Sequence, residues 1–156
     1  MFRYCIGIDQ SLSNTGIVVL DREDKSVVEI LDFKGTGLKP HFETGQDHYL
    51  QTISRVRGVV DCVKEVLLRY STEDSIVSLE RLASGGSKKS KDTDYVLAHL
   101  FYSVLTCIED MGFNRYITHP TTHKKTFFPP KTGKYKKKDL YKNFFESSFQ
   151  ETDYSI

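Results

Sequence analysis

The chain contains few of the residues that mark a secreted, zinc-binding or membrane-spanning protein. Its 156 residues include only three cysteines, Cys5, Cys62 and Cys107, which lie inside apolar patterns and lack the paired spacing of a zinc site. Their odd number argues against a disulfide framework, so we expect reduced core residues. No apolar run approaches a membrane span, and the first three residues lead into a strand pattern rather than a signal peptide. We expect a cytoplasmic protein with no membrane partner.

The common nucleotide-binding and acyl-transfer fingerprints are also missing. The chain contains no Walker, dinucleotide-binding or nucleophile-elbow motif, and its five histidines show no paired ligand spacing. A composition of 38% hydrophobic and 28% charged residues is typical of one compact domain, here 1–156. The formal net charge of +1 hides a basic segment, 124–142, which contains one acid, Asp139, and eight lysines. Such a segment is typical of a solvated surface or a phosphate-binding patch.

The hydrophobic periodicity predicts five strands and three helices. Strands are expected at 3–9, 16–20, 27–33, 75–80 and 115–118, and helices at about 46–69, 95–111 and 136–149. The first helix carries an apolar stripe, and Gly112 is a plausible stop signal for the second. Three strands followed by alternating helices and strands predict a mixed α/β sheet, with an antiparallel meander, two parallel strands and flanking helices. The expected stripe of the first helix consists of Leu50, Ile53, Val56, Val60, Val63 and Leu67.

Two of the expected strands end in an acid, Asp9 after the first and Glu80 after the fourth. If these strands are parallel neighbours, both acids lie near one end of the sheet, where ligands bind in such folds. A carboxylate flanked by Ile6 and Ile8 is costly to ionise unless a cation or hydrogen-bond donors compensate it. Oxygen ligands without histidine favour Mg²⁺, with Mn²⁺ as a possible substitute, over zinc. Capping of the following loop through Ser11 or Ser13 is an equal alternative for Asp9 alone.

Four segments together resemble a known family. They are IGIDQSLSNTG at 6–16, SLER at 78–81, HPTTHKK at 119–125 and the lysine-rich entry to the last expected helix. The chain resembles the RuvC-type Holliday-junction resolvases of the ribonuclease H-like superfamily, particularly those of bacteriophages and other viruses. The segments occur in the family's order and cover nearly the whole chain. The resemblance implies a ribonuclease H-like fold and a homodimer whose interface includes the second helix. It also implies a Mg²⁺-dependent endonuclease that resolves four-way junctions or other branched DNA. Its likeness to the viral members implies a viral protein that acts in the cytoplasm of the host cell.

The resemblance also assigns roles to individual residues. Asp9 and Glu80 become catalytic, metal-binding acids, and Lys124 or Lys125 together with Lys137 becomes a contact to the scissile phosphate region. The loop at 85–91 is expected to reach DNA near the branch point. The remaining expected DNA contacts are Ser11, Ser13, Arg81, Lys88, Lys89, Lys91, Lys125, Lys134 and Lys136.

The chain departs from the family pattern near its end. The family takes its remaining carboxylates from a DxxD-like element on a final helix, and Ile156 ends the sequence about where this element is expected. Glu151 and Asp153 are candidate substitutes, although an ordinary polar tail is the commoner case. Two-metal hydrolysis normally needs more than two acids. We therefore expect this chain to lack the final acidic helix, to cleave DNA poorly and to retain part of its DNA binding.

Two other functions are compatible with parts of the pattern. Asp9-Gln10-Ser11 with the Thr15-Gly16 hairpin also resembles the first phosphate loop of sugar kinases in the actin-like ATPase superfamily. Those enzymes are built from two such domains and need a second phosphate loop and an adenosine site, for which this chain has neither the length nor an obvious Gly-rich segment, so the alternative is a fragment of that fold. A branched-DNA-binding module without cleavage is the other alternative. Two acids facing a phosphate argue against it, because they repel the phosphate unless a cation intervenes.

Overall fold

The computed structural model describes residues 1–35, 45–81 and 91–118. Each of the seven elements expected in these ranges is present, with bounds that differ from the predicted ones by a few residues. The helix expected at 136–149 lies outside the described residues. The strands are β1 (Tyr4–Asp9), β2 (Asn14–Asp21), β3 (Ser26–Lys34), β4 (Ser75–Glu80) and β5 (Asn114–Thr118), and the helices are α1 (Gly45–Leu67) and α2 (Lys91–Asp110).

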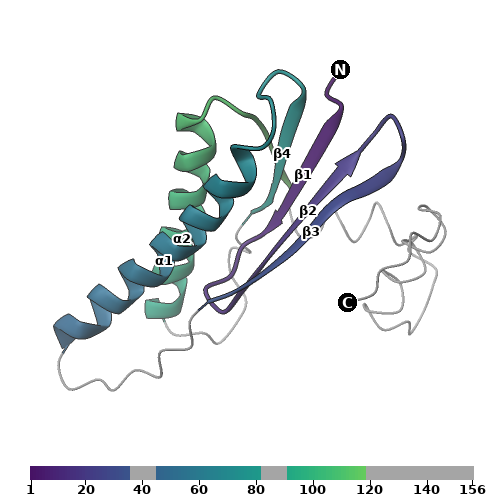
Figure 1. The fold of residues 1–156 in the computed structure, drawn as a ribbon. Helices are drawn as coiled ribbons and strands as arrows, with labels where there is room; N and C mark the ends of the chain where they lie inside the picture. Colours follow the sequence, from purple (N-terminus) through teal and green to yellow (C-terminus); the bar gives the residue numbers. More distant parts are fainter. Residues whose placement is uncertain (36–44, 82–90, 119–156) are drawn as a thin grey trace, which may run out of the picture.

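The five strands form one mixed sheet in the order β3-β2-β1-β4-β5. The pairs β1–β2 and β2–β3 are antiparallel, and the pairs β1–β4 and β4–β5 are parallel. The long helices account for the parallel pairs, because parallel neighbours need a crossover connection. The predicted sheet is thereby confirmed, including the pairing of the first strand with the fourth. Figure 1 shows the resulting layers, with α1 and α2 on the same side of the sheet.

The hydrophobic core lies between the sheet and the two helices. Side chains alternate between the faces of a strand, and the apolar positions of β1 and β4 point to the helix side. Ile6, Ile8, Val77 and Leu79 are all buried there, against α1 and α2 residues such as Leu100. Because side chains alternate along each strand, the residues between these buried positions lie on the face of the sheet that is turned away from the helices. No helix within the described ranges is long and apolar enough to cross a membrane.

The core-facing side of α1 differs from the expected stripe. Leu50 is 65% exposed and Ile53 is 40% exposed, so their assignment to the core is wrong. Val59 and Val66, which the stripe omitted, are fully or almost fully buried. The first turns of α1 project past the sheet and past α2, as Figure 1 shows, and leave little for their apolar residues to pack against. Farther along, α1 contacts both the sheet and α2, and its buried stripe widens accordingly.

The end of α2 confirms Gly112 as a stop signal. Gly112 has a positive φ of 77°, a conformation that costs glycine little. The Phe113 amide donates to the Ile108 carbonyl at 3.1 Å, and the Gly112 amide donates to the Glu109 carbonyl at 2.9 Å. This pattern is the Schellman motif, completed by the buried side chains of Phe113 and Ile108. The motif turns the chain directly into β5.

The three cysteines are free thiols, as expected, but each is half-buried rather than fully in the core. Burial raises the pKa of the Cys5, Cys62 and Cys107 thiols. These side chains therefore remain neutral thiols near pH 7 and behave as small apolar residues.

Candidate active site

Asp9 and Glu80 lie next to each other at one end of the sheet. The parallel pairing of β1 with β4 ends at Ile8 opposite Leu79, and the two acids follow directly on their strands. Because Ile8 and Leu79 point to the helices, Asp9 and Glu80 point to the other face. Neighbouring strands are about 4.8 Å apart, so both carboxylates are within reach of one small ligand. The prediction that these two acids lie together at one end of the sheet is therefore confirmed.

The surroundings of Asp9 differ from those assumed from the sequence. Ile6 and Ile8 lie on the opposite face, and Asp9 is exposed, so burial among apolar side chains does not make its charge costly. Asp9 does not cap the following loop either. Within the described ranges, no hydrogen bond or ion pair reaches the carboxylate of Asp9 or that of half-buried Glu80. Both carboxylates therefore lack a protein partner among the described residues.

The loop between β1 and β2 is held in place by other groups. The buried hydroxyl of Thr15 donates to the Ser11 carbonyl at 2.7 Å and accepts from the Ser11 amide at 3.2 Å. The Gly35 amide donates to the Ser13 carbonyl at 3.1 Å, and Arg55 Nη2 donates to the Leu12 carbonyl at 3.3 Å. These bonds connect the loop to its own hairpin, to the end of β3 and to α1. The backbone that follows Asp9 is thus fixed from three directions.

Glycine is required at position 35 by this close packing. A Cβ added at Gly35 would lie 2.1 Å from the Leu12 carbonyl oxygen, far inside contact distance. Only a residue without a side chain lets β3 approach the loop this closely. Gly16 contrasts with it, because a Cβ there would meet nothing within 4 Å.

Three of the expected DNA contacts lie beside the acids. Ser11 and Ser13 follow Asp9, with their hydroxyl oxygens 3.1 Å apart, and Ser13 is exposed. Arg81 follows Glu80, is exposed, and its amide donates to the Thr118 carbonyl at 2.7 Å. The side chain of Lys91, at the start of α2, is not described. The other expected contacts lie outside the described residues: Lys88, Lys89, Lys124, Lys125, Lys134, Lys136 and Lys137, together with the acids Glu151 and Asp153.

The fold adds residues to this edge that the sequence pattern did not single out. Asp32 is exposed and lies in the same row as Asp9, because Asp9 pairs with Gly16 and Gly16 pairs with Asp32. Gln10 Nε2 donates to the Glu80 carbonyl at 2.9 Å. Finding Asp32 requires the register of β2 with β3, and finding Gln10 requires a contact across 70 residues. The polar alternation of β3 around Asp32 was the only available signal.

The acids at this end of the sheet offer few protein ligands for a divalent cation. In the part of the chain that the structure describes, no three His, Cys, Asp or Glu side chains gather closely enough to enclose a metal. Mg²⁺ is usually held by one or two carboxylates, waters and substrate phosphates, rather than by an all-protein cage. Two adjacent carboxylates with oxygen ligands only, on an accessible edge, therefore fit Mg²⁺ or Mn²⁺. They do not form a closed site of the zinc or calcium type.

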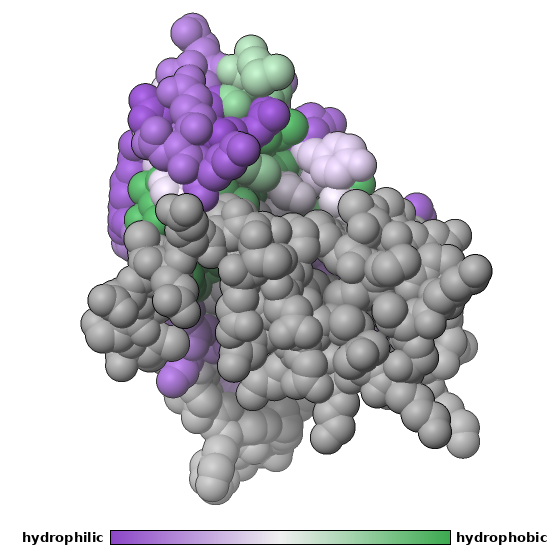
Figure 2. Space-filling view, turned by 90° about the vertical axis from the view of Figure 1, so that its right-hand side faces the viewer, coloured by the Kyte–Doolittle hydropathy of each residue, from purple (hydrophilic) through white to green (hydrophobic). Residues whose placement is uncertain are grey.

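A groove lined by α1 and α2 lies away from these acids. It has a volume of about 710 Å³ and runs between the outward sides of α1 and α2, with Val60, Tyr102 and Met111 in its lining. The acids are on the other face of the sheet. In Figure 2, hydrophilic residues gather at the upper end of the described surface, the end at which the chain begins. We therefore assign the groove no part in the chemistry of the acidic edge.

Comparison with known proteins identifies the fold. No protein-family model matches the chain, and no curated protein sequence matches it significantly. Among solved structures, RuvC of Thermus thermophilus matches with a TM-score of 0.66 and 18% identity, over 96% of this chain and 83% of that one. The same protein in complex with a Holliday junction substrate matches with a TM-score of 0.61 and 17% identity, over 81% of this chain and 70% of that one. The chain thus has the ribonuclease H-like fold that RuvC has.

Proposed function

We propose that this protein is a structure-selective DNA endonuclease that resolves four-way junctions or other branched DNA by metal-dependent phosphodiester hydrolysis. The observation that carries the proposal is the position of Asp9 and Glu80, adjacent and accessible at the end of two parallel strands. Support comes from the ribonuclease H-like sheet that this chain has in common with RuvC, a protein also solved with a Holliday junction substrate.

The chemistry follows from the charges at this edge. Two unpaired carboxylates repel a phosphodiester, so DNA binding here requires a cation between them. A bound Mg²⁺ or Mn²⁺ would activate a water for in-line attack and stabilise the leaving oxygen. Asp9 and Glu80 would hold the cation, and Ser13 and Arg81, which are exposed, would contact the neighbouring DNA backbone.

Further parts of the proposal concern residues outside the described ranges. Lys124 or Lys125 together with Lys137 would contact the scissile phosphate region, and the lysines around the 85–91 loop would contact DNA near the branch. Glu151 and Asp153 are the candidate additional acids, and a second cation would be held weakly without such ligands. Relationship to the phage and viral members, and action in the cytoplasm of a host cell, remain predictions from the sequence resemblance.

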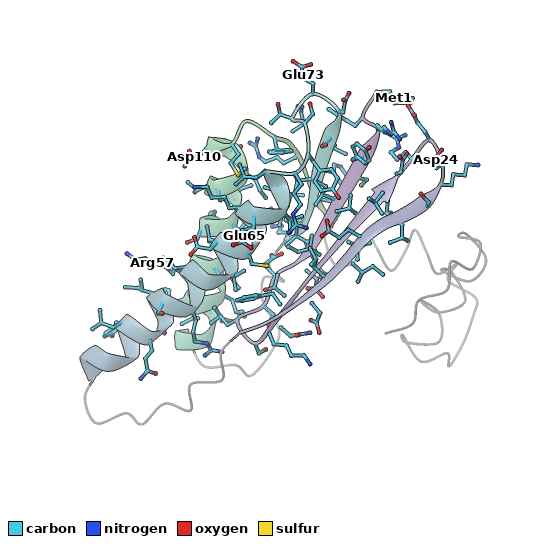
Figure 3. All side chains as sticks on the ribbon, viewed as in Figure 1. Met1, Asp24, Arg57, Glu65, Glu73 and Asp110 are labelled. Carbon is cyan, nitrogen blue, oxygen red and sulfur yellow. The ribbon has the colours of Figure 1, made fainter. Side chains whose placement is uncertain are left out.

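Homodimerisation is the second part of the proposal. The groove between α1 and α2 carries cations and anions together, Arg57 and Lys64 with Asp61 and Asp110. Figure 3 shows Arg57 and Asp110 at different heights along the helices. Tyr102 borders the groove and is 63% exposed. A two-fold pairing would bring this surface of mixed charge against a copy of itself, as an isologous interface requires. Sedimentation equilibrium tests this: Tyr102→Glu should shift a dimer to monomer, and a purely monomeric wild type contradicts it.

The nuclease proposal is tested by nicking of a synthetic four-way junction in Mg²⁺ and in Mn²⁺, with linear duplex as the comparison. We expect slow but junction-selective nicking by the wild type, and a further loss of at least about 100-fold in Asp9→Asn, the scale of removing one electrostatic stabiliser. Junction affinity should be retained or improved in Asp9→Asn, because a negative charge facing the phosphate is removed. Asp24→Asn, in the exposed turn at the other end of the sheet, is the control and should nick normally.

A branched-DNA-binding module with little cleavage is the second candidate. It is favoured by the absence of a three-acid group within the described ranges. The same assay separates the two, since a pure binder retains the junction selectively but leaves it intact in Mn²⁺ over long incubations. Nicking by Asp9→Asn at the wild-type rate would contradict the nuclease proposal. Equal loss of binding and cutting in that variant would instead indicate a folding role for Asp9.

A further inference from the structure

The side chain of Gln10 connects the two strands that carry the acids. Backbone pairing between β1 and β4 ends at Ile8 opposite Leu79, one residue before Asp9 and Glu80. Each of these two strands remains paired for one more residue with its other neighbour. Asp9 of β1 pairs with Gly16 of β2, and Glu80 of β4 pairs with Thr118 of β5. Gln10 Nε2 donates to the Glu80 carbonyl at 2.9 Å, across the place where the central ladder has ended. The amide thus supplies the next connection between the two acid-bearing strand ends.

The chemistry of this bond determines how the amide is oriented. The Glu80 carbonyl only accepts hydrogen bonds, so Nε2 must face it and Oε1 must point elsewhere. Oε1 is buried and receives no hydrogen bond from the described residues. A side chain in this position cannot be replaced by an apolar residue of similar length without losing the donor.

The backbone around Gln10 limits its movement. Gln10 lies between Asp9, which is paired with Gly16, and Ser11, which is bonded to the buried hydroxyl of Thr15 in both directions. Arg55 and Gly35 hold the next two carbonyls, those of Leu12 and Ser13. Gln10 is half-buried within this framework. Because the backbone at Gln10 is held in place, its amide can hold the end of β4 at a fixed position relative to the end of β1. A mobile surface glutamine cannot do this.

We propose that Gln10 is a positioning residue that sets the separation of Asp9 and Glu80. The inference rests on the proposed function, in which these acids hold a divalent cation. Two like charges on adjacent strands repel each other, and the register shows no backbone pairing of β1 with β4 beyond Ile8 and Leu79. Mg²⁺ demands near-ideal geometry at its short oxygen distances, so a small splaying of the strand ends weakens its binding. Mutation of a residue that hydrogen-bonds a metal ligand typically lowers the affinity for the metal by about 10- to 100-fold.

The test uses Gln10→Met, which keeps the length and removes the donor, and Gln10→Asn, which keeps the amide and shortens its reach. Gln51→Met, at another half-buried glutamine on α1, is the control. Binding of Mn²⁺ alone is measured by isothermal titration calorimetry on the full chain. Both Gln10 variants should raise the Kd for Mn²⁺ by about 10- to 100-fold, with nicking at saturating Mn²⁺ reduced much less. The control should leave the Kd unchanged.

A second measurement does not depend on the metal. Without Mn²⁺, hydrogen exchange of the backbone amides at 9–11 and 80–81 should accelerate in both Gln10 variants, while the urea midpoint stays close to that of the wild type. Unchanged exchange at these amides, or a lowered urea midpoint with an unchanged Kd for Mn²⁺, would overturn the positioning role. A wild type that binds no Mn²⁺ would overturn the proposed function instead, and the exchange result would still decide the role of Gln10.

Discussion

The two ends of the β1–β2 hairpin each carry an aspartate, and the two carboxylates differ in burial and in hydrogen-bond partners. Asp21, opposite Tyr4, is 4% exposed and lies at the end of the sheet where Figure 3 labels Met1 and Asp24. Its carboxylate accepts a hydrogen bond from Arg3 Nε at 2.9 Å and others from the amides of Glu23 and Asp24. The Arg3 hydrogen bond, followed by the backbone amides, lowers the pKa of Asp21 despite its burial. Asp9, at the opposite end, is exposed and has no such partner within the described ranges.

This contrast distinguishes a structural carboxylate from one that is available to a ligand. The same hairpin provides an arginine and backbone donors for Asp21, yet none of the described residues provides a donor for Asp9 or Glu80. The framework near Asp9 is nevertheless well fixed, through Thr15, Arg55 and Gly35. A rigid backbone with uncompensated acids is typical of a site that binds a cation together with its substrate.

The largest expected effect concerns stabilisation by metal. Mn²⁺ at about 100 times its Kd should raise the free energy of unfolding of the wild type by about 2.7 kcal/mol. Asp9→Asn and Glu80→Gln should lose this increment, whereas Asp21→Asn should keep it, because Asp21 is already neutralised by Arg3. Urea unfolding with and without Mn²⁺ measures all four proteins. If Asp9→Asn keeps the increment, Asp9 does not bind the metal, and Asp9 and Asp21 do not differ in this respect.

The next effect concerns the framework at the acid-bearing end. Gly35→Ala should destabilise the protein by about 1 to 3 kcal/mol, the usual range for overpacking, because its Cβ would lie 2.1 Å from the Leu12 carbonyl oxygen. Displacement of the loop should also weaken Mn²⁺ binding. Gly16→Ala is the matched control for unfolding, since its Cβ meets nothing within 4 Å. Equal urea midpoints for the two variants would show that the loop is not tightly held.

A smaller effect concerns the opposite end and depends on pH. The lowered pKa of Asp21 means that its charged form stabilises the folded state above its unfolded pKa of about 3.9, and that this contribution is lost as the pH falls through the lower folded pKa. Asp21→Asn, which removes the charge and keeps the shape, should therefore be less stable than the wild type at pH 6. The difference should shrink as the pH falls below about 4. A difference that is constant from pH 6 to pH 2 would contradict the role of the charge.

Much of the fold was predictable because its local patterns and its topology agree. The acid-terminated strands at 4–9 and 75–80, the separating helices and the glycine at 112 are each local signals that lead to one sheet order. The predicted pairing of β1 with β4 placed Asp9 and Glu80 at one edge without any structural information. The core-facing side of α1 was less predictable, because the place where a helix leaves the sheet is not encoded in its own periodicity.

The details of the site depended on non-local contacts. The exposure of Asp9 reflects its parity in β1, which places Ile6 and Ile8 on the other face and removes the burial that the sequence appeared to imply. Asp32 lies in line with Gly16 and Asp9 across the sheet only because of the register between β2 and β3. Gln10 reaches a carbonyl 70 residues away. Such contacts arise from tertiary packing, and no pattern within a short window of sequence predicts them.

The most direct test of the central claim is the position of Mn²⁺ in crystals grown with that ion, located by its anomalous scattering. The proposal predicts a peak within bonding distance of one carboxylate oxygen of Asp9 and one of Glu80, on the face of the sheet opposite α1 and α2. A fully occupied Mn²⁺ held by only one of these acids, or found only elsewhere on the protein, would contradict a joint metal site.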